Sequence, residues 1–587
     1  MSMLASLVSA YDRMAERQEV PLFGYSTEKI SFVISLNEDG YPAGMPIDIR
    51  EKQGRKLLAR PMAVPQPTKR TSGIAPNFLW DKTSYVLGVT AGEGKRLADE
   101  HAAFVSRHLE ALTDTEDDGL VAVRLFLQNW NPDQFKDLEW PEEMKDQNVV
   151  FALESERLRG IHIHDRPAAK RLWNLASSSN EENKAVCLVT GEPGPVARLH
   201  PAIKGVWGAQ SSGASLVSFN LDAFTSYGHE QGDNAPVSEA AAFAYTTALN
   251  KLLENGSHNR VQIGDASTVF WADASDVSIA QEAENTFAAM FGADIDENIQ
   301  SKRVGVILNN IRKGLPLRSF APELESDVRF YVLGLAPNAA RLSVRFWLES
   351  DFGSIAAHYQ RFLNDIRIEP PPQNPHAPLW RYLMEMAVLG KRENVPPNLA
   401  GEWMRSILTG TNYPWTLLSS TLMRLRADKA ISDYRAAILK AILVRNFNMR
   451  GTPVALDPEN RNKGYMLGRL FAVYEHVQSA ALGRNVNATI KDKFYGAASA
   501  QPRKVFALLG SGVAHHLSKV GKEKAGFKIT LERQISEIMD LMSPDDDPFP
   551  AALPAEQQAL FGLGYYHQRS EFFKSRKHDA ESEKEAS

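Results

Sequence analysis

The sequence predicts an α+β protein, in which a large mixed α/β N-terminal region is followed by an all-α C-terminal helical bundle. Up to residue 367, short apolar runs typical of strands alternate with segments of helical periodicity. Beyond the proline-rich stretch at 368–375, apolar residues recur every three or four positions as far as Met542, which indicates helices. We therefore divide the chain into a mixed region at 1–367 with a subdomain boundary near 115–150, a linker at 368–376, a bundle at 377–545 and a C-terminal segment at 546–587, whose charged tail from Lys574 is expected to be disordered.

The N-terminal elements follow from local patterns. An apolar stripe predicts a helix at Leu4–Arg17. The turn Asn37–Gly40 predicts a hairpin, because glycine supplies the positive φ that tight hairpins need. The hairpin strands are expected near 30–36 and 45–49, further helices at 99–113 and 120–130, and further strands at 149–153 and 160–164.

The stretch from Ala185 to Leu253 holds two loops of ligand size. The first, Lys204–Gly213, is rich in glycine and serine, and the second, Ser226–Asn234, is polar. Ser238 is positioned to cap an alanine-rich helix, and loops that end on a helix N-terminus suit an anionic ligand. Ordinary turns in a mixed sheet are the alternative. Strands are expected at 185–189, 214–220, 264–272, 331–335 and 342–347, and helices at 279–291 and 297–312.

Composition bounds the class of protein. The chain has 587 residues, of which 43% are hydrophobic and 23% charged, as in a globular protein. No apolar run approaches the roughly 20 residues that a membrane helix needs, and no signal peptide is evident, so we expect a cytoplasmic protein. The single cysteine, Cys187, excludes an internal disulfide and any site with several cysteine ligands.

Charge is unevenly distributed along the chain. The net charge is −5, but Arg424–Lys528 holds 19 lysine and arginine residues against 7 aspartate and glutamate residues, a local charge of +12. Such asymmetry predicts a basic surface for a polyanion. Basic residues of the bundle that fall largely outside its apolar stripes are Arg461, Lys463, Arg469, Arg484, Lys491, Lys493, Arg503 and Lys504.

A second basic segment lies near the N-terminus, in a loop that prolines keep extended. Lys69 and Arg70 are followed by Thr71, Ser72 and Asn77. Basic side chains for phosphate and short polar side chains for base edges are what a duplex-contacting loop needs. A solvated surface loop is the alternative.

The familiar catalytic motifs are missing from the sequence. It has no phosphate-binding G-x-x-x-x-G-K-[ST], no G-x-S-x-G and no H-E-x-x-H, so we expect a protein that is not an enzyme and has no cofactor or metal. His162 and His164 stand at i and i+2, on one face of the expected strand, where a metal pair is geometrically feasible. With Asp165 they define the alternative of a metal-dependent nuclease.

Several long blocks, in one order, match a known family. They are FGYSTEKISFVISLNEDG, RTSGIAPNFLWDKTSYVLG, ARLHPAIKGVWGAQSSGASLVSFN, FYVLGLAPNAARLSVRFW and DPENRNKGYMLGRLFAVYEHVQ. The chain resembles the large subunit of the type I-C CRISPR surveillance complex (Cascade), from the first helix to the end of the bundle.

The resemblance implies a non-catalytic DNA-binding subunit. It would lie beside the crRNA 5′ handle, next to the backbone and crRNA-processing subunits, and would recognise the protospacer-adjacent motif (PAM) in duplex DNA. It would promote unwinding and R-loop formation, while base pairing reads the rest of the target. It would also help recruit a helicase–nuclease. The alternative within this setting is a scaffold that binds only guide RNA.

The resemblance also implies how the candidate residues divide. The C-terminal bundle resembles a small subunit translated from an internal start, for which Met449 and Met466 are candidates. The eight basic residues of the bundle are then candidates for the displaced strand. Candidates for the duplex and its PAM are Lys69, Arg70, Thr71, Ser72, Asn77, Lys204, Gln210, Ser211, Ser212 and Asn234.

Overall fold

The computed structural model describes residues 2–53, 56–67, 73–177, 184–219, 221–292, 302–326, 328–483, 488–543 and 545–585. Contacts divide the chain into two units. The first unit holds Met1–Pro201 and Val217–Ala248, and the second holds Ala202–Leu216 and Leu249–Ser587. Small sheets are followed by a long run of helices, so the predicted α+β class is confirmed.

A four-stranded mixed sheet forms the centre of the first unit. Its strand order is β3 (Ile47–Asp48), β2 (Phe32–Leu36), β8 (Asn148–Leu153) and β7 (Trp80–Lys82), and only the β2–β8 pair is parallel. Every residue of β2 is buried, because an apolar strand such as FVISL needs cover on both faces. The predicted hairpin and the strand at 149–153 are confirmed.

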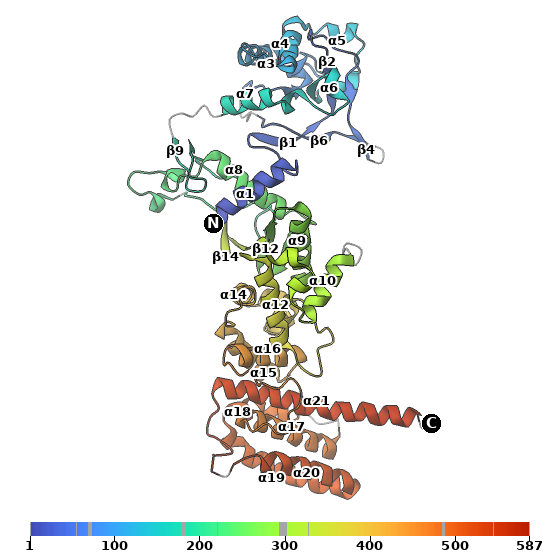
Figure 1. Ribbon diagram of the computed structural model, residues 1–587, viewed down its shortest axis with the longest axis vertical. Coiled ribbons are helices and arrows are strands. Elements are labelled where there is room, and N and C mark those ends of the chain that lie inside the picture. The colour runs from blue at the N-terminus through green and yellow to red at the C-terminus, as the bar shows by residue number, and fades with distance from the viewer. Residues whose placement is uncertain are drawn as a thin grey trace. The chain divides into compact units, whose positions relative to one another are not determined.

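Helices and a separate ribbon surround this sheet. Helix α4 (Asp118–Asn129) packs on β2 and β8, and α3 (Leu97–Ala111) packs on α4 (Figure 1). Strands β1 (Tyr25–Ile30) and β6 (Arg60–Pro65) form an antiparallel ribbon. The remaining elements are α1 (Met3–Glu16), β4 (Glu51–Gln53), β5 (Lys56–Leu58), α2 (Thr83–Val86), α5 (Gln134–Asp137), η1 (Glu142–Met144), α6 (Glu154–Arg157), η2 (Ile163–Asp165), α7 (Pro167–Ser177), β9 (Lys184–Val186), β10 (Pro193–Pro195), η4 (Asp222–Phe224) and η5 (Gln231–Asn234).

Two predicted strands are wrong. The segment at 160–164 enters the 3-10 turn η2, because the His162 amide donates to Asp165 Oδ2 at 3.2 Å and closes a tight turn. The segment at 214–220 makes only two isolated bridges, from Ala214 to Ile203 and from Ser215 to Arg341. The Ser238 cap is confirmed, since the Ala241 amide donates to Ser238 Oγ at 3.3 Å at the start of α8 (Glu239–Leu252).

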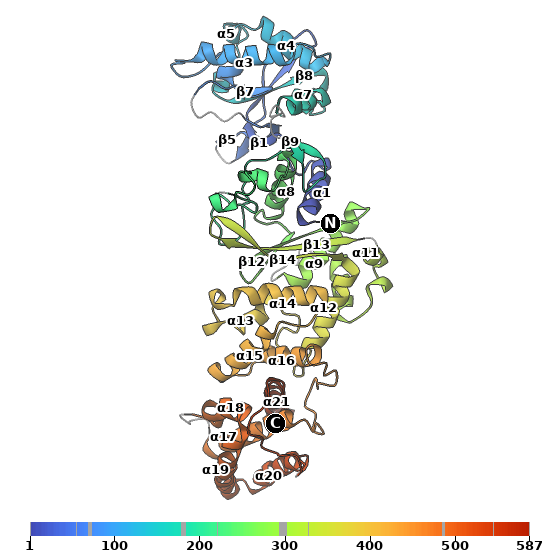
Figure 2. The same ribbon diagram turned by 90° about the vertical axis from the view of Figure 1, so that its left-hand side faces the viewer.

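The second unit begins with an antiparallel sheet. Its strand order is β11 (Arg260–Ile263), β12 (Ala266–Asp273), β13 (Arg329–Asn338) and β14 (Arg341–Asp351). Helices α12 (Phe352–Ile366) and α14 (Pro397–Thr409) pack on each other and lie on the same side of this sheet (Figure 2). The other elements of this part are α9 (Val277–Phe291), α10 (Lys302–Arg312), η6 (Leu317–Ser319) and α11 (Pro322–Ser326).

The chain from residue 379 onward is helical, as the periodicity predicts. Helix α17 (Lys463–Leu482) packs along α21 (Ala555–Glu585), and one buried apolar cluster continues from the sheet into the bundle. The remaining elements are α13 (Leu379–Met384), η7 (Val388–Gly390), η8 (Arg392–Asn394), α15 (Trp415–Asp428), α16 (Asp433–Arg445), α18 (Ile490–Ala500), α19 (Pro502–Glu523) and α20 (Ala525–Asp540).

Two predicted segments, the proline-rich linker and the disordered tail, differ from the structure. The proline-rich segment packs within the second unit: Ile368 is buried, the Glu369 amide donates to Val454 O at 2.8 Å, and Tyr566 Oη donates to Pro370 O at 2.9 Å. It is therefore not a free linker between the mixed region and the helical bundle. The tail from Lys574 is helical as far as Glu585 rather than disordered, in keeping with its content of the strong helix formers glutamate, lysine and alanine.

Candidate nucleic-acid interface

The N-terminal basic loop lies largely outside the described residues. Lys69, Arg70, Thr71 and Ser72 all fall in the undescribed stretch 68–72. Asn77, the fifth candidate from this segment, is 4% exposed, and its amide donates to Asp81 Oδ2 at 2.8 Å. Asn77 is therefore part of the interior, and we remove it from the residues that present a side chain to a duplex.

A polar hollow of about 520 Å³ adjoins the end of this loop at Gly73. Its lining includes three cations, Lys82, Lys95 and Arg96, and the hydroxyl side chains of Ser84 and Thr90. Two acids, Glu100 and Asp146, also reach it, and Asp146 accepts from Thr90 Oγ1 at 2.7 Å. Cations and hydroxyls around a concave surface are the groups that bind phosphate and sugar. These residues were not among the predicted contacts, although the run GEGKR at 92–96 indicates a flexible basic turn.

The loop at 204–213 belongs to the second unit and has a fixed base. Ile203 and Ala214 exchange backbone hydrogen bonds of 2.9 and 2.8 Å, and the Lys204 amide donates to Asn250 Oδ1 at 2.7 Å. The candidate side chains Lys204, Gln210, Ser211 and Ser212 are all exposed. A loop anchored at its base with exposed polar residues can approach a groove, as predicted for this segment.

Trp207 is a residue of this loop that the sequence analysis missed. Its side chain is 51% exposed, its amide donates to Ser267 Oγ at 3.0 Å, and the Arg392 guanidinium lies 5.7 Å from the centre of its ring. An exposed aromatic ring with an arginine over it forms a stacking surface for a base.

In the loop at 226–234, a predicted contact residue hydrogen-bonds within the loop itself. The Asn234 amide nitrogen donates to His229 O at 3.3 Å and to Gln231 O at 3.1 Å, so this predicted duplex contact is committed to holding the loop together. Tyr227 is instead 99% exposed, at a turn closed by a 2.9 Å bond from the His229 amide to Ser226 O. A fully exposed aromatic side chain at the tip of a turn leaves its apolar surface in water, which is unfavourable. Such a side chain is typical of a residue that contacts a partner.

The positive charge that the bundle presents at its surface is smaller than the charge counted from its sequence. Five of the cations in Arg424–Lys528 are buried and hydrogen-bonded, namely Arg424, Arg435, Lys440, Arg445 and Arg469. Arg469 was a candidate for the displaced strand. It donates to Pro458 O at 2.7 Å and to Gln568 Oε1 at 3.1 Å, so the prediction of an exposed position is wrong.

The other candidates of the bundle differ in how free their charge is. Lys463 lies 2.6 Å from Asp546, and Arg503 lies 2.5 Å from Asp547. Arg484 falls outside the described residues, whereas Arg461, Lys493 and Lys504 are exposed and Lys491 is half-buried. The acidic run at 545–547 thus neutralises part of the positive charge of the bundle. The charge counted over Arg424–Lys528 does not include this run.

One face of α19 gathers exposed basic residues. Lys504, His515, Lys519 and Lys522 are all exposed, and at 100° per residue they fall within about 60° of one another. They span 18 residues of helix, about 27 Å, long enough to follow several phosphates. None of the three lysines has an ion pair with another described residue. We call these four residues the α19 basic face; only Lys504 of them was among the predicted contacts.

A further basic hollow, of about 390 Å³, lies beside the proline-rich segment. It is lined by Arg312, Lys313, Arg367 and His376, against one acid, Glu369. Desolvation, together with the charge of Arg312, lowers the pKa of His376. The hollow therefore favours an anion even with His376 neutral.

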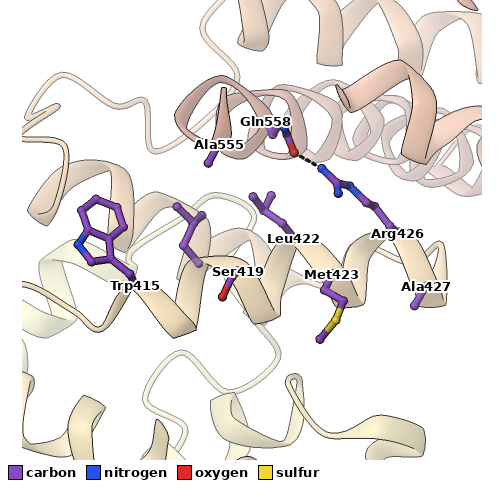
Figure 3. A pocket seen from close by; sticks show the side chains of 9 residues that line it. Trp415, Ser419, Leu422, Met423, Arg426, Ala427, Ala555 and Gln558 are labelled. Carbon is purple, nitrogen blue, oxygen red and sulfur yellow. Dashed lines mark hydrogen bonds between the residues drawn. The ribbon is translucent and has the colours of Figure 1, made fainter. Parts of the chain in front are cut away.

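The hollow between α15 and α21 has a different character. It measures about 720 Å³ and is lined largely by apolar atoms, among them the side chains of Trp415, Leu422 and Met423 (Figure 3). Its one cation, Arg426, is engaged by Gln558 across the groove. The lining of this hollow therefore suits an apolar partner better than a phosphate.

His162, His164 and Asp165 do come together, although not on a strand. Their ligand atoms all lie within 4.8 Å of one another in the turn η2. In the sequence this cluster is far from the basic loops at 68–72 and 204–213.

No helix in the described part of the chain combines the length and the apolarity that crossing a membrane requires.

The described residues thus combine small sheets, a long helical region and several basic surfaces. The model of a family described as CRISPR-associated protein (Cas_Csd1) matches residues 7–573, nearly the whole chain. The chain therefore belongs to the Cas_Csd1 family of CRISPR-associated proteins. None of the curated proteins compared with the chain matches it.

Proposed function

We propose that this chain is the non-catalytic large subunit of a type I-C CRISPR RNA-guided surveillance complex. In this role it recognises the PAM in duplex DNA, promotes unwinding and R-loop formation, and helps recruit the helicase–nuclease. The observation that carries the proposal is the hollow at Gly73, whose three cations and two hydroxyls lie directly after the basic loop of a Cas_Csd1 chain. Membership of the family makes the other subunits of such a complex its expected partners.

The candidate groups divide into three sets with different tasks. Lys69, Arg70, Lys82, Lys95 and Arg96 supply positive charge for the phosphates of a duplex, which fixes position without reading sequence. Gln210, Ser211 and Ser212 carry donors and acceptors suited to groove edges. Trp207 and Tyr227 offer rings on which a base released from the duplex can stack.

The α19 basic face suits the displaced strand. Its lysines lie in a row on one helix, without the acidic partners that Lys463 and Arg503 have. Binding of a single strand by such a row is governed by phosphate neutralisation, so it depends strongly on salt.

The test uses the assembled, guide-loaded complex and matched duplexes that differ only in their flanking bases. In a mobility-shift series, Lys82→Ala/Lys95→Ala/Arg96→Ala and Lys69→Ala/Arg70→Ala should each weaken binding to the preferred duplex at least about tenfold, while the complex still assembles. Arg157→Ala is the matched control, because this exposed cation is already paired with Glu154 at 2.9 Å. Binding that is equally tight with every flanking sequence, or that does not need this subunit, would refute PAM recognition.

One observation favours a guide-RNA scaffold as a second candidate function. The hollow beside the proline-rich segment gathers Arg312, Lys313 and Arg367 in the second unit. If this hollow holds RNA, Arg312→Ala/Arg367→Ala will weaken binding of crRNA in a filter assay and leave duplex binding by the assembled complex unchanged.

A further inference from the structure

The turn η2 places three metal-ligating side chains side by side in the first unit. His162 Nδ1 lies 3.2 Å from Asp165 Oδ2, and His164 Nε2 lies 3.8 Å from Asp165 Oδ1. The two imidazole rings are nearly parallel, with an angle of 10° between them and centres 5.3 Å apart. Hydrogen bonds between the Asp165 carboxylate and both the backbone and the ring of His162 close the turn. The turn also places the His164 ring beside the same carboxylate.

His164 has no role in this turn that explains its position. Its side chain is fully buried, and neither ring nitrogen has a hydrogen-bond partner among the residues that the structure describes. Buried polar side chains are nearly always paired, so an unpaired, fully buried imidazole calls for a partner such as an ion.

We propose that His162, His164 and Asp165 bind one divalent transition-metal ion of the zinc class, with water as the fourth ligand. Two imidazole nitrogens and a carboxylate oxygen are a common ligand set for Zn²⁺. Ligand atoms at 2.0–2.1 Å from a tetrahedral ion lie about 3.3 Å from one another. Here the two imidazoles lie 3.2 and 3.8 Å from the two different oxygens of Asp165, and one ligand atom from each residue lies within 4.8 Å of the others, so small side-chain shifts would close the site. Asp165 is 40% exposed, which leaves a path for the ion to enter.

The surroundings give the ion a structural task. The turn η2 contacts β8, β6 and α7, and Tyr25 Oη of β1 donates to the His164 carbonyl at 2.8 Å. All three proposed ligands belong to this one turn, so an ion held here would stiffen the turn before α7, which the Tyr25 hydrogen bond joins to the β1–β6 ribbon.

The experiment uses the full chain, stripped with a chelator and titrated with Zn²⁺ alone. Elemental analysis after gel filtration should find one Zn²⁺ per chain, and Co²⁺ in its place should give the visible absorption of a tetrahedral site. His162→Gln and Asp165→Asn should each weaken Zn²⁺ binding by about 100-fold or more, since loss of a supporting residue alone costs about 10–100-fold. Both residues are partly exposed, so these variants avoid the folding risk of changing His164.

His229→Gln is the matched control, because His229 is an exposed histidine of the same unit. It should bind Zn²⁺ like the unaltered chain, and Zn²⁺ should raise the melting temperature of both. No stoichiometric Zn²⁺, or equal binding by His162→Gln and Asp165→Asn, would mean that His164 is only a buried neutral imidazole. Zn²⁺- or Mg²⁺-dependent DNA cleavage that His162→Gln abolishes would overturn the structural role.

Discussion

Arg445 and Asp365 form an ion pair that is shielded almost completely from water. Arg445 Nη2 lies 2.6 Å from Asp365 Oδ2, and the two side chains are 0% and 5% exposed. Tyr413 Oη donates to the same carboxylate oxygen at 2.9 Å, and the guanidinium lies 4.1 Å from the centre of the Tyr413 ring. The pair joins α12 to α16, so it links the sheet-packed helices to those that follow.

Removing one partner of this pair should destabilise the second unit strongly. Arg445→Met leaves the Asp365 carboxylate buried without its counter-charge, which costs about 3–5 kcal/mol in comparable cases. We expect a lower midpoint in guanidinium denaturation. The exposed pair Arg533–Glu537, 69% and 61% exposed, is the control, and Arg533→Met should leave the midpoint almost unchanged. A small effect at Arg445 would mean that water reaches the pair.

Close packing of α17 on α21 should make Gly468 intolerant of a side chain. A Cβ at Gly468 would collide with the backbone carbonyl of Phe561, and one at Gly564 with that of Tyr465. Gly468→Ala therefore forces two helix backbones apart, and we expect a loss of about 1–3 kcal/mol in chemical denaturation.

Gly512 on α19 is the matched control for Gly468. A Cβ there meets no atom within 4 Å. Gly512→Ala should stabilise the bundle by about 0.5–1 kcal/mol, because alanine favours the helix more than glycine does. If both substitutions stabilise, the two helices are not in close contact.

His108 should make the first unit sensitive to acid. Its Nε2 accepts from the Leu79 amide at 2.8 Å, and its Nδ1 lies 2.8 Å from Phe104 O, a pattern that requires the neutral ring. Burial lowers the pKa of His108 to about 4. Above pH 6.5 neither state of the chain is protonated at this ring. Between pH 6.5 and 4 only the unfolded state gains the proton, so stability falls as the pH falls, by about 3 kcal/mol in all.

The measurement is the free energy of unfolding from urea titrations at pH 7, 6 and 5. His108→Gln should have a shallower dependence on pH than the unaltered chain. His229→Gln, at an exposed loop position, should keep the full dependence. Parallel curves for the unaltered chain and His108→Gln would assign the acid sensitivity to other groups.

The α19 basic face should set part of the salt dependence of single-strand binding. Lys504→Ala/Lys519→Ala/Lys522→Ala removes three free cations, which should reduce the slope of log K against log[salt] by about 2. Arg503→Ala, on the same helix but paired with Asp547 at 2.5 Å, should change the slope by less. An unaltered slope in the triple variant would mean that the displaced strand follows another surface.

Local sequence patterns predicted the secondary-structure elements better than they predicted the environment of individual residues. The helix at the N-terminus, the hairpin around Asn37–Gly40, the Ser238 cap and the paired strands at 331–347 are confirmed, because each depends on neighbours in sequence. The strand at 160–164 failed, since the bond between His162 and Asp165 competes with extended backbone. Periodicity alone does not register such a bond.

The candidate site shows the same division. The exposure of Gln210 and Ser211 follows from a glycine- and serine-rich loop, and was foreseen. Arg469 was misplaced, because a cation becomes internal when a distant segment supplies its partner: Gln568 lies 99 residues from Arg469. Asn77 was misplaced because it is buried, although its hydrogen-bond partner Asp81 is close in the sequence. Lys519 and Lys522 were overlooked, although their spacing along one helix was visible in the sequence.

The sequence by itself determined the α+β class, the helical C-terminal region, the local surplus of positive charge in Arg424–Lys528 and the family to which the chain belongs. Tertiary structure decided which of those charges reach solvent, that the proline-rich segment packs against the bundle, and that His162, His164 and Asp165 share one point. The reason is that hydrogen bonding and burial between residues far apart in the chain depend on how the elements pack, whereas propensity, periodicity and net charge are properties of the residues themselves.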